Sequence, residues 1–348
     1  MASADPWRYS VRWALYHFRP STQQHTELSQ RPLRHSFETA PGPRVRVVMA
    51  GDLTDTPIAS CSPSISRVFA RGDLVVGSYR ADHVDADALR ATLATLEVDP
   101  PRCVLALAND RAGDGGPERL TRTADALHRM DLSSVGTIAN GELPLTTVEA
   151  GGLRLGVAAW THWLGRDRFA EGQCVANPEQ VLHHDWAAIK REQRLDSLLG
   201  SPHWEWPDQF VPRQDTVAIA QHLAESGFDV IGGHHPGIAQ PMEWFATPDG
   251  HMNICQFSLG ALGGSGQWPQ RLGLLLEAEL VADGDRRGRV ASYQLHPVAT
   301  IDSADGPRLV PLRYAPLALR QNMWQRIELL FDEARYPNKQ PLRVASPL

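Results

Sequence analysis

The chain has 348 residues, enough to bury a large core in one large or two medium domains. Its 34 basic and 40 acidic residues give a net charge of −6, which argues against a general nucleic-acid or anionic-membrane surface. The four cysteines (Cys61, Cys103, Cys174, Cys255) lack CxxC spacing, so we expect reduced thiols. Because no stretch approaches the roughly 18 apolar residues of a membrane span, we expect a cytoplasmic protein without membrane contact.

Residues 1–42 alternate aromatic and basic side chains, then turn polar and end in a Pro-Gly-Pro run at 41–43. We interpret them as an N-terminal arm with one helix or strand that docks on the body or on a neighbouring subunit. A partly disordered leader is an equally good interpretation of the same residues.

The pattern becomes β/α from Pro43 onward. The apolar runs predict strands over 44–50, 73–77, 102–108, 195–200, 252–259, 271–281 and 289–300. Helical spacing predicts helices over 117–130, 214–226 and 316–335. Gly151-Gly152 between two apolar runs predicts a hairpin, and we expect the last three strands to be mostly antiparallel. The order of elements predicts one domain over 43–315, a sandwich of sheets with helices outside, followed by a C-terminal helix and tail over 316–348.

Potential ligand side chains follow several of the predicted strands. They are found in the segments Gly51-Asp52, Gly77–Arg80, Ala108-Asn109-Asp110-Arg111, His203-Trp204 and Gly233-His234-His235-Pro236. Ligands bind beyond the carboxyl ends of strands in α/β sheets, and histidine is the commonest ligand for transition metals. With Asp73 at the start of the second strand, the chain order of Asp, carboxylate, Asn, His and His resembles the layout of a dinuclear metallophosphatase site.

The same segments resemble the CapA family of poly-γ-glutamate capsule biosynthesis proteins, which have the calcineurin-like metallophosphatase fold. The family pattern runs GD, D-x-x-x-x-N-L-E, ANNH-x-x-D-x-G, HWG, G-x-HPH-x-x-Q and SLGN. Over residues 45–300 this chain has, in the same order, MAGD (49–52), DLVVGSYR (73–80), ANDRAGDGG (108–116), HWE (203–205), GHHPGIAQ (233–240) and SLGA (258–261). The resemblance implies an α/β fold, a calcineurin-like metallophosphatase sandwich of two mixed β-sheets flanked by helices.

The chain departs from the family pattern at four positions. Arg80 stands where the resemblance places a carboxylate that bridges two metals, and Arg111 where it places a histidine that protonates the leaving group. Gly237 replaces the second histidine of HPH, and Ala261 replaces the asparagine of SLGN.

These departures change the metal content that the resemblance implies. One ion would keep Asn109, His203 and His235, with Asp52 or Asp110 completing its ligand set, whereas the other would keep only Asp52. An arginine at the bridging position adds repulsion and cannot lose its proton. We therefore expect at most one divalent ion (Mn, Zn or Fe), or none.

Each candidate residue also has a structural interpretation. His203 and His235 are either ligands and catalytic groups or buried histidines behind the site, and His234 faces either the substrate or the opposite side. Asp52 is either a ligand or an ion-pair partner of Arg80, with helix capping a weaker alternative. Asn109 either touches a metal or holds its own turn. Arg80 and Arg111 either bind a substrate anion or neutralise neighbouring aspartates.

Two functions remain open at this point. The first is a CapA-like biosynthetic enzyme that hydrolyses or forms an amide, or acts on a phosphate-bearing substrate, and takes a small-molecule or peptide anion. Its catalytic groups would be Asp52, His203 and His235, and its anion would be held by Arg80, Arg111 and His234. The second is a catalytically inactive scaffold whose residues 1–42 engage a partner protein or a second copy of the chain. A fully active dinuclear phosphatase would need carboxylates that the sequence lacks.

Overall fold

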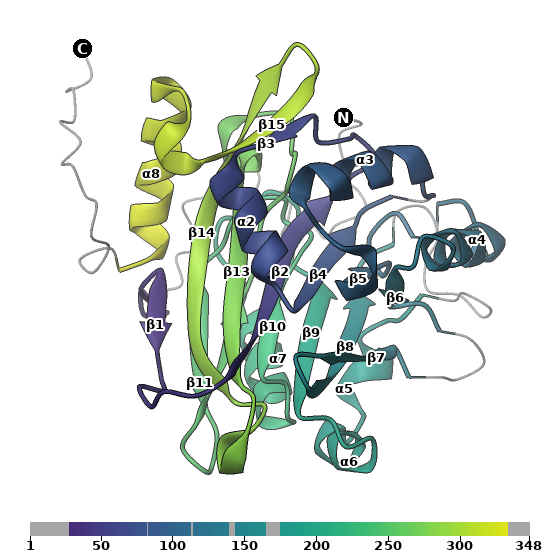
Figure 1. The fold of residues 1–348 in the computed structure, drawn as a ribbon, viewed down its shortest axis with the longest axis vertical. Helices are drawn as coiled ribbons and strands as arrows, with labels where there is room; N and C mark the ends of the chain where they lie inside the picture. Colours follow the sequence, from purple (N-terminus) through teal and green to yellow (C-terminus); the bar gives the residue numbers. More distant parts are fainter. Residues whose placement is uncertain (1–27, 82, 113, 139–142, 165–174, 333–348) are drawn as a thin grey trace.

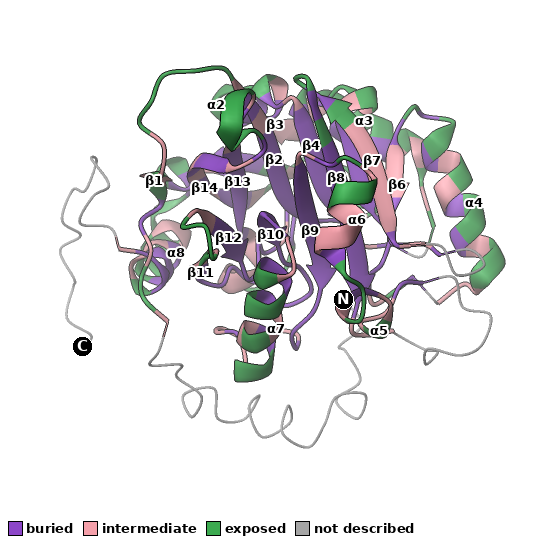
Figure 2. Ribbon diagram, turned by 90° about the horizontal axis from the view of Figure 1, so that it is seen from below, coloured by how far each residue is buried: buried purple, intermediate pink, exposed green. Residues whose placement is uncertain are grey.

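The structure is a computed structural model that describes residues 28–332, apart from residues 82, 113, 139–142 and 165–174. Two mixed β-sheets pack against each other, with helices on their outer faces (Figure 1). Burial follows this layering, because the strands are largely buried and the helices expose their outer sides (Figure 2). The predicted α/β sandwich of two mixed sheets is confirmed.

The larger sheet has nine strands within the described residues. In spatial order they are β3 (Ser60–Cys61), β15 (Gly306–Pro311), β14 (Val290–Ser303), β13 (Leu272–Val281), β2 (Arg44–Leu53), β4 (Leu74–Tyr79), β5 (Cys103–Ala106) and β6 (Ser133–Val135), with β1 (Arg34–Ser36) beside β14. The four strands β2, β4, β5 and β6 are parallel. Their carboxyl ends therefore lie at one edge of the sheet.

The smaller sheet has six strands in the same part of the chain. In order they are β11 (Met242–Ala246), β12 (Met252–Gln256), β10 (Val230–Gly232), β9 (Ser197–His203), β8 (Leu153–Thr161) and β7 (Leu145–Ala150). The strands β8, β9, β10 and β12 are parallel, so they too end at a common edge. The predicted hairpin is confirmed, because β7 and β8 pair across Gly151 and Gly152. Their φ values of 57° and 85° belong to the left-handed region that such tight turns require.

The helices cover the outer faces of both sheets. Against the larger sheet lie α2 (Pro63–Arg71), α3 (Ala86–Leu96) and α4 (Pro117–His128). Against the smaller sheet lie α5 (Glu179–Leu182), α6 (Trp186–Glu192) and α7 (Gln214–Glu225). The remaining helices of the described residues are α8 (Leu317–Leu330) and the short 3-10 turns η3 (Pro100–Arg102), η4 (Trp268–Arg271), η5 (Gly284–Arg286) and η6 (Leu312–Tyr314). None of the helices in the described ranges is both long and apolar enough to cross a membrane.

The predicted run of three antiparallel strands is wrong for the first of them. β13 and β14 do pair antiparallel, but β12 lies in the smaller sheet, parallel to β10 and antiparallel to β11. The chain crosses between the sheets after β12, through Gly260 at φ 69°. A side chain there would place Cβ 2.6 Å from the Leu272 carbonyl oxygen, so only glycine fits this crossing.

The segment just before the domain is fastened to both sheets. β1 pairs with β14 of the larger sheet, while Arg31 Nε donates to Glu243 of β11 in the smaller sheet at 2.7 Å. The Tyr293 hydroxyl donates to the Pro32 carbonyl oxygen at 2.7 Å and accepts from Trp244 Nε1 at 3.2 Å. The described part of the predicted arm thus docks on the body. Residues 1–27 and 333–348 lie outside the described residues, and the division into arm, domain and tail stays a prediction.

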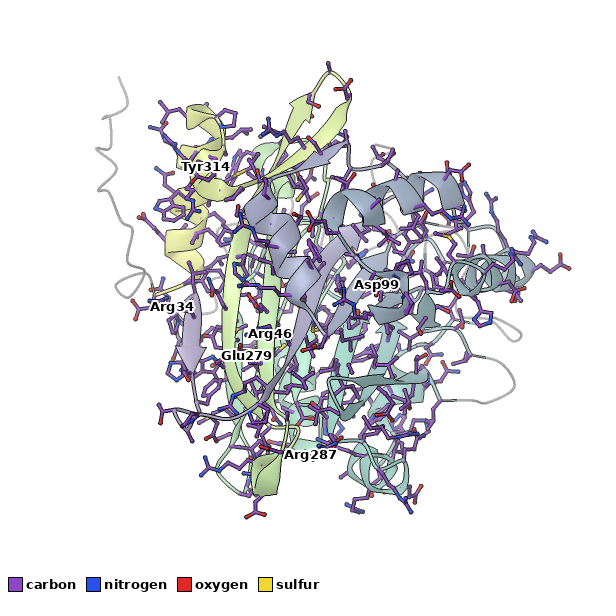
Figure 3. The ribbon with its side chains drawn as sticks, in the orientation of Figure 1. Arg34, Arg46, Asp99, Glu279, Arg287 and Tyr314 are labelled. Carbon is purple, nitrogen blue, oxygen red and sulfur yellow. The ribbon has the colours of Figure 1, made fainter. Side chains whose placement is uncertain are left out.

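A polar hollow of about 580 Å³ lies on the outer face of the larger sheet. Figure 3 shows Arg46 and Glu279 on this face, with Arg34 on the neighbouring strand β1. Arg46 Nε lies 3.2 Å from Glu279 Oε1, and Glu277 pairs with His296 at 2.8 Å. Both glutamates of this hollow already have ion-pair partners, Glu279 in Arg46 and Glu277 in Arg71, and none of the strand-end histidines lines it.

We predict that Tyr293→Phe lowers the free energy of unfolding by about 1–2 kcal/mol, because the change leaves Pro32 and Trp244 without their buried hydrogen-bond partner. Denaturant unfolding at neutral pH measures this loss. Tyr314→Phe is the matched control, since Tyr314 is 65% exposed and should unfold like the wild type. Equal midpoints for the two variants would show that the segment is not held through this hydroxyl.

Candidate metal centre

The strand ends of the two sheets meet at one place. From the larger sheet, β2 contributes Asp52, Arg80 directly follows β4, and Asp110 lies in the turn after β5. From the smaller sheet, β9 ends at His203, and the segment after β10 brings His234 and His235. A bridge between His203 and His234 keeps these two ends side by side.

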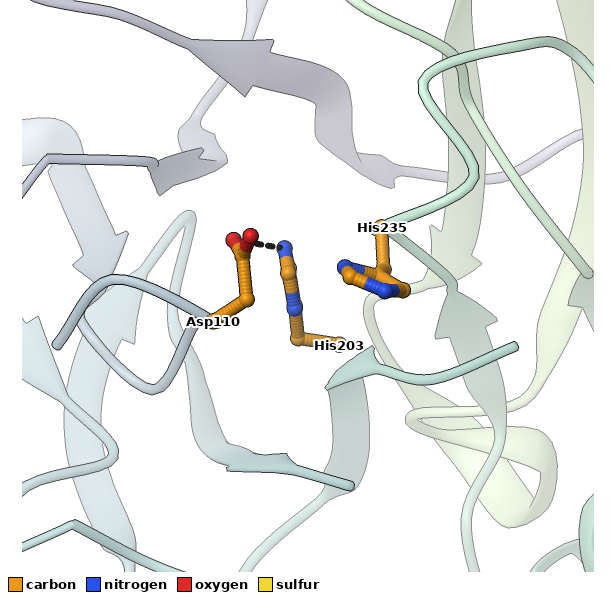
Figure 4. A group of neighbouring side chains, drawn as sticks. All are labelled: Asp110, His203 and His235. Carbon is orange, nitrogen blue, oxygen red and sulfur yellow. Dashed lines mark ion pairs between the residues drawn. The ribbon is translucent and has the colours of Figure 1, made fainter. Parts of the chain in front are cut away.

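Three of these side chains form a group with metal-ligand spacing. Ligand atoms of Asp110, His203 and His235 all lie within 4.8 Å of one another. Asp110 Oδ1 is 3.6 Å from His203 Nε2, and the rings of His203 and His235 have centroids 4.5 Å apart. Figure 4 shows His203 between the other two side chains. Two imidazoles and a carboxylate are a ligand set that catalytic zinc and similar metals use, with a further position left for water or substrate.

Asp52 and His234 lie beside this group. His234 Nδ1 is 3.4 Å from Asp52 Oδ1, which in turn is 4.0 Å from His203 Nε2. All three side chains are buried. Among the described residues, no hydrogen bond reaches either oxygen of Asp52 or either nitrogen of His234. The interpretation of His234 as facing the opposite side is wrong, because its ring contacts Asp52.

Arg80 pairs with Asp110. Its Nε and Nη2 donate to the two oxygens of Asp110 at 2.7 and 2.8 Å, a bidentate geometry. Arg80 was interpreted either as a binder of a substrate anion or as a counter-charge for an aspartate, and this contact is the second of these. Its partner is Asp110 and not the expected Asp52. Arg111 lies further out, 44% exposed at its side chain, with Nε 3.8 Å from Asp114 Oδ2.

Asn109 holds the turn that presents Asp110. Its side-chain amide donates to the carbonyl oxygens of Tyr79 at 2.8 Å and Leu107 at 3.0 Å. Its Oδ1 accepts from the backbone N–H of Arg111 at 2.9 Å. These bonds satisfy backbone groups where β5 ends. Asn109 is thus engaged in the turn. Asp110, which the sequence suggested only as an additional ligand beside Asn109, lies at the ligand position.

The protonation states suit a cation. Burial raises the pKa of Asp110, but the charge and hydrogen bonds of Arg80 outweigh it and hold that pKa below its usual range. Burial likewise raises the pKa of Asp52, and the contact with His234 together with the charges of His203 and Arg80 lowers it overall. Burial lowers the pKa of His203 to about 4 and that of His235 well below its usual range. At neutral pH Asp52 and Asp110 are therefore ionised and the imidazoles of His203 and His235 are neutral, the forms that bind metals.

The surroundings orient the two histidines. The Thr161 hydroxyl lies 3.5 Å from His203 Nδ1, so Nε2 is the nitrogen directed at Asp110. The ring of Trp163 stacks on His235 with centroids 6.3 Å apart. Thr161 and Trp163 were not among the predicted site residues, although Thr161 ends β8 and Trp163 lies two residues beyond it, where side chains of a strand-end site are expected.

The backbone at His235 is strained. Its φ of 95° is a conformation that residues other than glycine rarely adopt. Neighbouring bonds hold it there, since His234 N donates to Pro202 O at 2.8 Å and Asp208 N donates to Pro236 O at 2.9 Å.

The residues present fit one divalent ion. Nitrogen and oxygen ligand atoms in the metal-binding protonation state converge at Asp110, His203 and His235. His203 Nε2 has no hydrogen bond from the described residues.

Comparisons with known proteins give sequence relatives along most of the chain. The family model described as bacterial capsule synthesis protein PGA_cap matches residues 70–262. The PGA biosynthesis protein CapA of Bacillus subtilis is 22% identical over 251 residues, which cover 67% of this chain and 64% of that protein. The capsule biosynthesis protein CapA of Bacillus anthracis is 28% identical over 166 residues, 45% of this chain and 39% of that protein. The chain therefore matches less than two thirds of the length of either relative.

Solved structures give more distant similarities. A hypothetical protein from Thermus thermophilus has a TM-score of 0.43 and 17% identity, over 73% of this chain and 98% of that one. NAD nucleotidase from Haemophilus influenzae has a TM-score of 0.46 and 11% identity, over 82% of this chain and 56% of that one. Because the PGA_cap model covers more than half of the sequence, as the motif resemblance to CapA predicted, this chain belongs to the family of bacterial capsule synthesis proteins PGA_cap.

Proposed function

We propose that the chain is a CapA-like biosynthetic enzyme that uses one divalent metal ion to hydrolyse or form an amide, or to act on a phosphate-bearing substrate. The observation that supports it best is the group formed by partly buried Asp110 and buried His203 and His235, with ligand atoms within 4.8 Å of one another. These three residues would hold the ion. Asn109, which had been predicted as a ligand, would act by fixing the turn before Asp110.

The chain's own residues would do the positioning. Arg80 holds the Asp110 carboxylate in one orientation through two hydrogen bonds, and Thr161 directs His203. Trp163 covers one face of the His235 ring. When bound, the ion would supply Lewis acidity toward a carbonyl or phosphoryl oxygen and would acidify a water molecule. Burial of His203 and His235 limits competition from bulk water.

The charge of the site favours an anionic substrate group. The carboxylates of Asp52 and Asp110 outweigh the guanidinium of Arg80 by one negative charge, and a divalent ion would reverse this to one positive charge. An excess positive charge in a buried site attracts a carboxylate or phosphate strongly, because the local dielectric is low. Arg111 at the exposed side of the turn would extend this attraction outward.

One observation favours the alternative, an inactive scaffold that binds a partner protein or a second copy of the chain. Asp110 is already neutralised by Arg80, so a metal is not needed to balance its charge. Metal content separates the two functions.

We predict about one divalent ion per chain in protein purified without chelator or His-tag, and its loss in the double variant His203→Ala/His235→Ala. Mass spectrometry of the metal content measures this. His128→Ala, at an exposed position in the last turn of α4, is the control and should keep the ion. A wild-type protein that binds no divalent ion, even when Mn, Zn or Fe is added, would exclude the metalloenzyme and leave the scaffold.

We also predict that the metal-free protein loses stability as the pH falls from about 6.5 to about 4. The neutral form of His203 is favoured in the folded state, so protonation of the unfolded chain below its pKa of 6.5 lowers the free energy of unfolding. His203 alone accounts for about 3 kcal/mol over this window. Denaturant unfolding at several pH values measures the slope. His203→Gln should reduce the dependence of the free energy of unfolding on pH, and His128→Ala should leave it unchanged. Equal slopes in wild type and His203→Gln would show that His203 is not buried in its neutral form.

A further inference from the structure

The outward side of α8 carries exposed apolar side chains. Among the described residues, the large hydrophobic side chains that are exposed are Tyr314 (65%), Leu317 (57%) and Leu329 (71%). Tyr314 ends η6, directly before α8, and the two leucines lie near opposite ends of the helix. Single exposed hydrophobic side chains are ordinary on protein surfaces. Three of them on one short stretch of chain indicate an interaction surface.

The inward side of α8 is already packed against the domain. Met323, Ile327 and Leu330 are buried on this side. Arg326 Nη2 donates to the carbonyl oxygen of Ala239 at 2.9 Å. The helix lies along one edge of the molecule (Figure 1). Because its inward side is fixed in this way, α8 presents its outward side in one orientation.

The outward side has the form of a ridge. Leu317, Gln321, Gln325 and Leu329 follow one another at intervals of four residues, and all four are exposed. We call these four residues the α8 ridge. Side chains with this spacing form a continuous row on a helix, and two such rows interdigitate when two helices cross at about −50°. The α8 ridge therefore has the shape that packs against a second ridge of the same kind.

The order of side chains along the α8 ridge is the same in both directions, Leu-Gln-Gln-Leu. A two-fold axis across the helix at the level of Met323 would place Leu317 against the partner's Leu329. The same axis would place Gln321 against the partner's Gln325, so that each amide meets a group that can both donate and accept. A two-fold dimer needs a surface that is complementary to itself. The α8 ridge meets this requirement, which favours a second copy of the chain over an unrelated partner.

Charge also favours a second copy at this surface. The chain has a net charge of −6, so two copies repel each other on average. The α8 ridge carries no charged side chain, and the exposed residues beside it, Ala318 and Asn322, are short and uncharged. Two copies can therefore meet here without bringing like charges into contact, and the short side chains leave room for the second ridge.

The size of the surface limits the strength of the contact. The 14 residues of α8 span about 21 Å, and a helix is about 10 Å wide. This is smaller than the roughly 800 Å² that each partner contributes to an interface of standard size. We therefore expect a dimer that forms reversibly and only at high protein concentration.

We propose that the α8 ridge is the surface through which two copies of this chain form a weak two-fold dimer, with Leu317 of each copy against the partner's Leu329. The inference does not rest on the proposed function, because none of the residues at the metal centre takes part in the contact.

Sedimentation equilibrium on the full chain tests the dimer. The average mass should rise from 38.4 kDa toward twice this value as the protein concentration increases. Leu317→Glu should weaken dimerisation by at least about a hundredfold, because a charge replaces an apolar contact and the two-fold axis repeats the loss. Ala91→Glu is the matched control, since it adds the same charge at an exposed position of α3 and should associate like the wild type.

Two double variants test the antiparallel register. In Leu317→Lys/Leu329→Glu, each introduced lysine faces an introduced glutamate of the other copy, so dimerisation should recover by at least about tenfold relative to Leu317→Glu. In Leu317→Glu/Leu329→Glu, like charges face each other and the chain should stay monomeric. Circular dichroism and thermal unfolding check that each variant is folded.

Three results would overturn the inference. The first is a wild-type mass that stays at 38.4 kDa up to the highest concentration reached. The second is a folded Leu317→Glu variant that dimerises as strongly as the wild type, which would place the contact elsewhere on the chain. The third is equal association of the two double variants, because the two-fold pairing of Leu317 with the partner's Leu329 requires them to differ.

Discussion

The site is shaped by the need to balance two carboxylates between the sheets, of which Asp52 is buried and Asp110 is partly buried. Asp110 receives a full counter-charge from Arg80 through two hydrogen bonds. Asp52 receives no hydrogen bond of good geometry from any described residue, and the nitrogen beside it is His234 Nδ1 at 3.4 Å. Charge in a low-dielectric interior must be matched. The charge of Asp110 is therefore balanced by Arg80, whereas the charge of Asp52 needs a further cation or proton to balance it.

Close backbone approach is what brings the strand ends together. A side chain at Gly51 would place Cβ 2.2 Å from the Gly260 carbonyl oxygen, and one at Gly233 would place it 2.1 Å from the Phe257 carbonyl oxygen. Each of these glycines directly precedes a site residue, Asp52 in one sheet and His234 in the other. The two glycines therefore allow the segments that carry Asp52 and His234 to lie in backbone contact with residues 257–260. Any larger residue would move the carboxylate and the imidazole apart.

The strands that carry the site residues could be predicted well from the sequence, because apolar patterning identifies strands directly. Apolar runs marked β2, β4, β5 and β9, and parallel strands deliver their carboxyl ends to one edge. What failed depends on geometry beyond the strands. For His234 the sequence left two interpretations open, one facing the substrate and one facing away from His235 as neighbours do on a strand. β10 ends at Gly232, however, and the φ of 95° at His235 breaks the alternation, so that both rings enter the site.

The partner of Arg80 could not be read from the sequence for a similar reason. Asp52 and Asp110 both stand at ends of strands next to β4, so spacing along the chain does not distinguish them. The choice depends on the turn that Asn109 builds, which lifts Asp110 toward the guanidinium. With Asp110 fixed in this way, Arg80 acts as a permanent positive charge inside the ligand group. A permanent charge weakens the hold of the protein on any divalent ion, so cation binding in this chain depends more on the anion that accompanies it than it would in a site built from carboxylates alone.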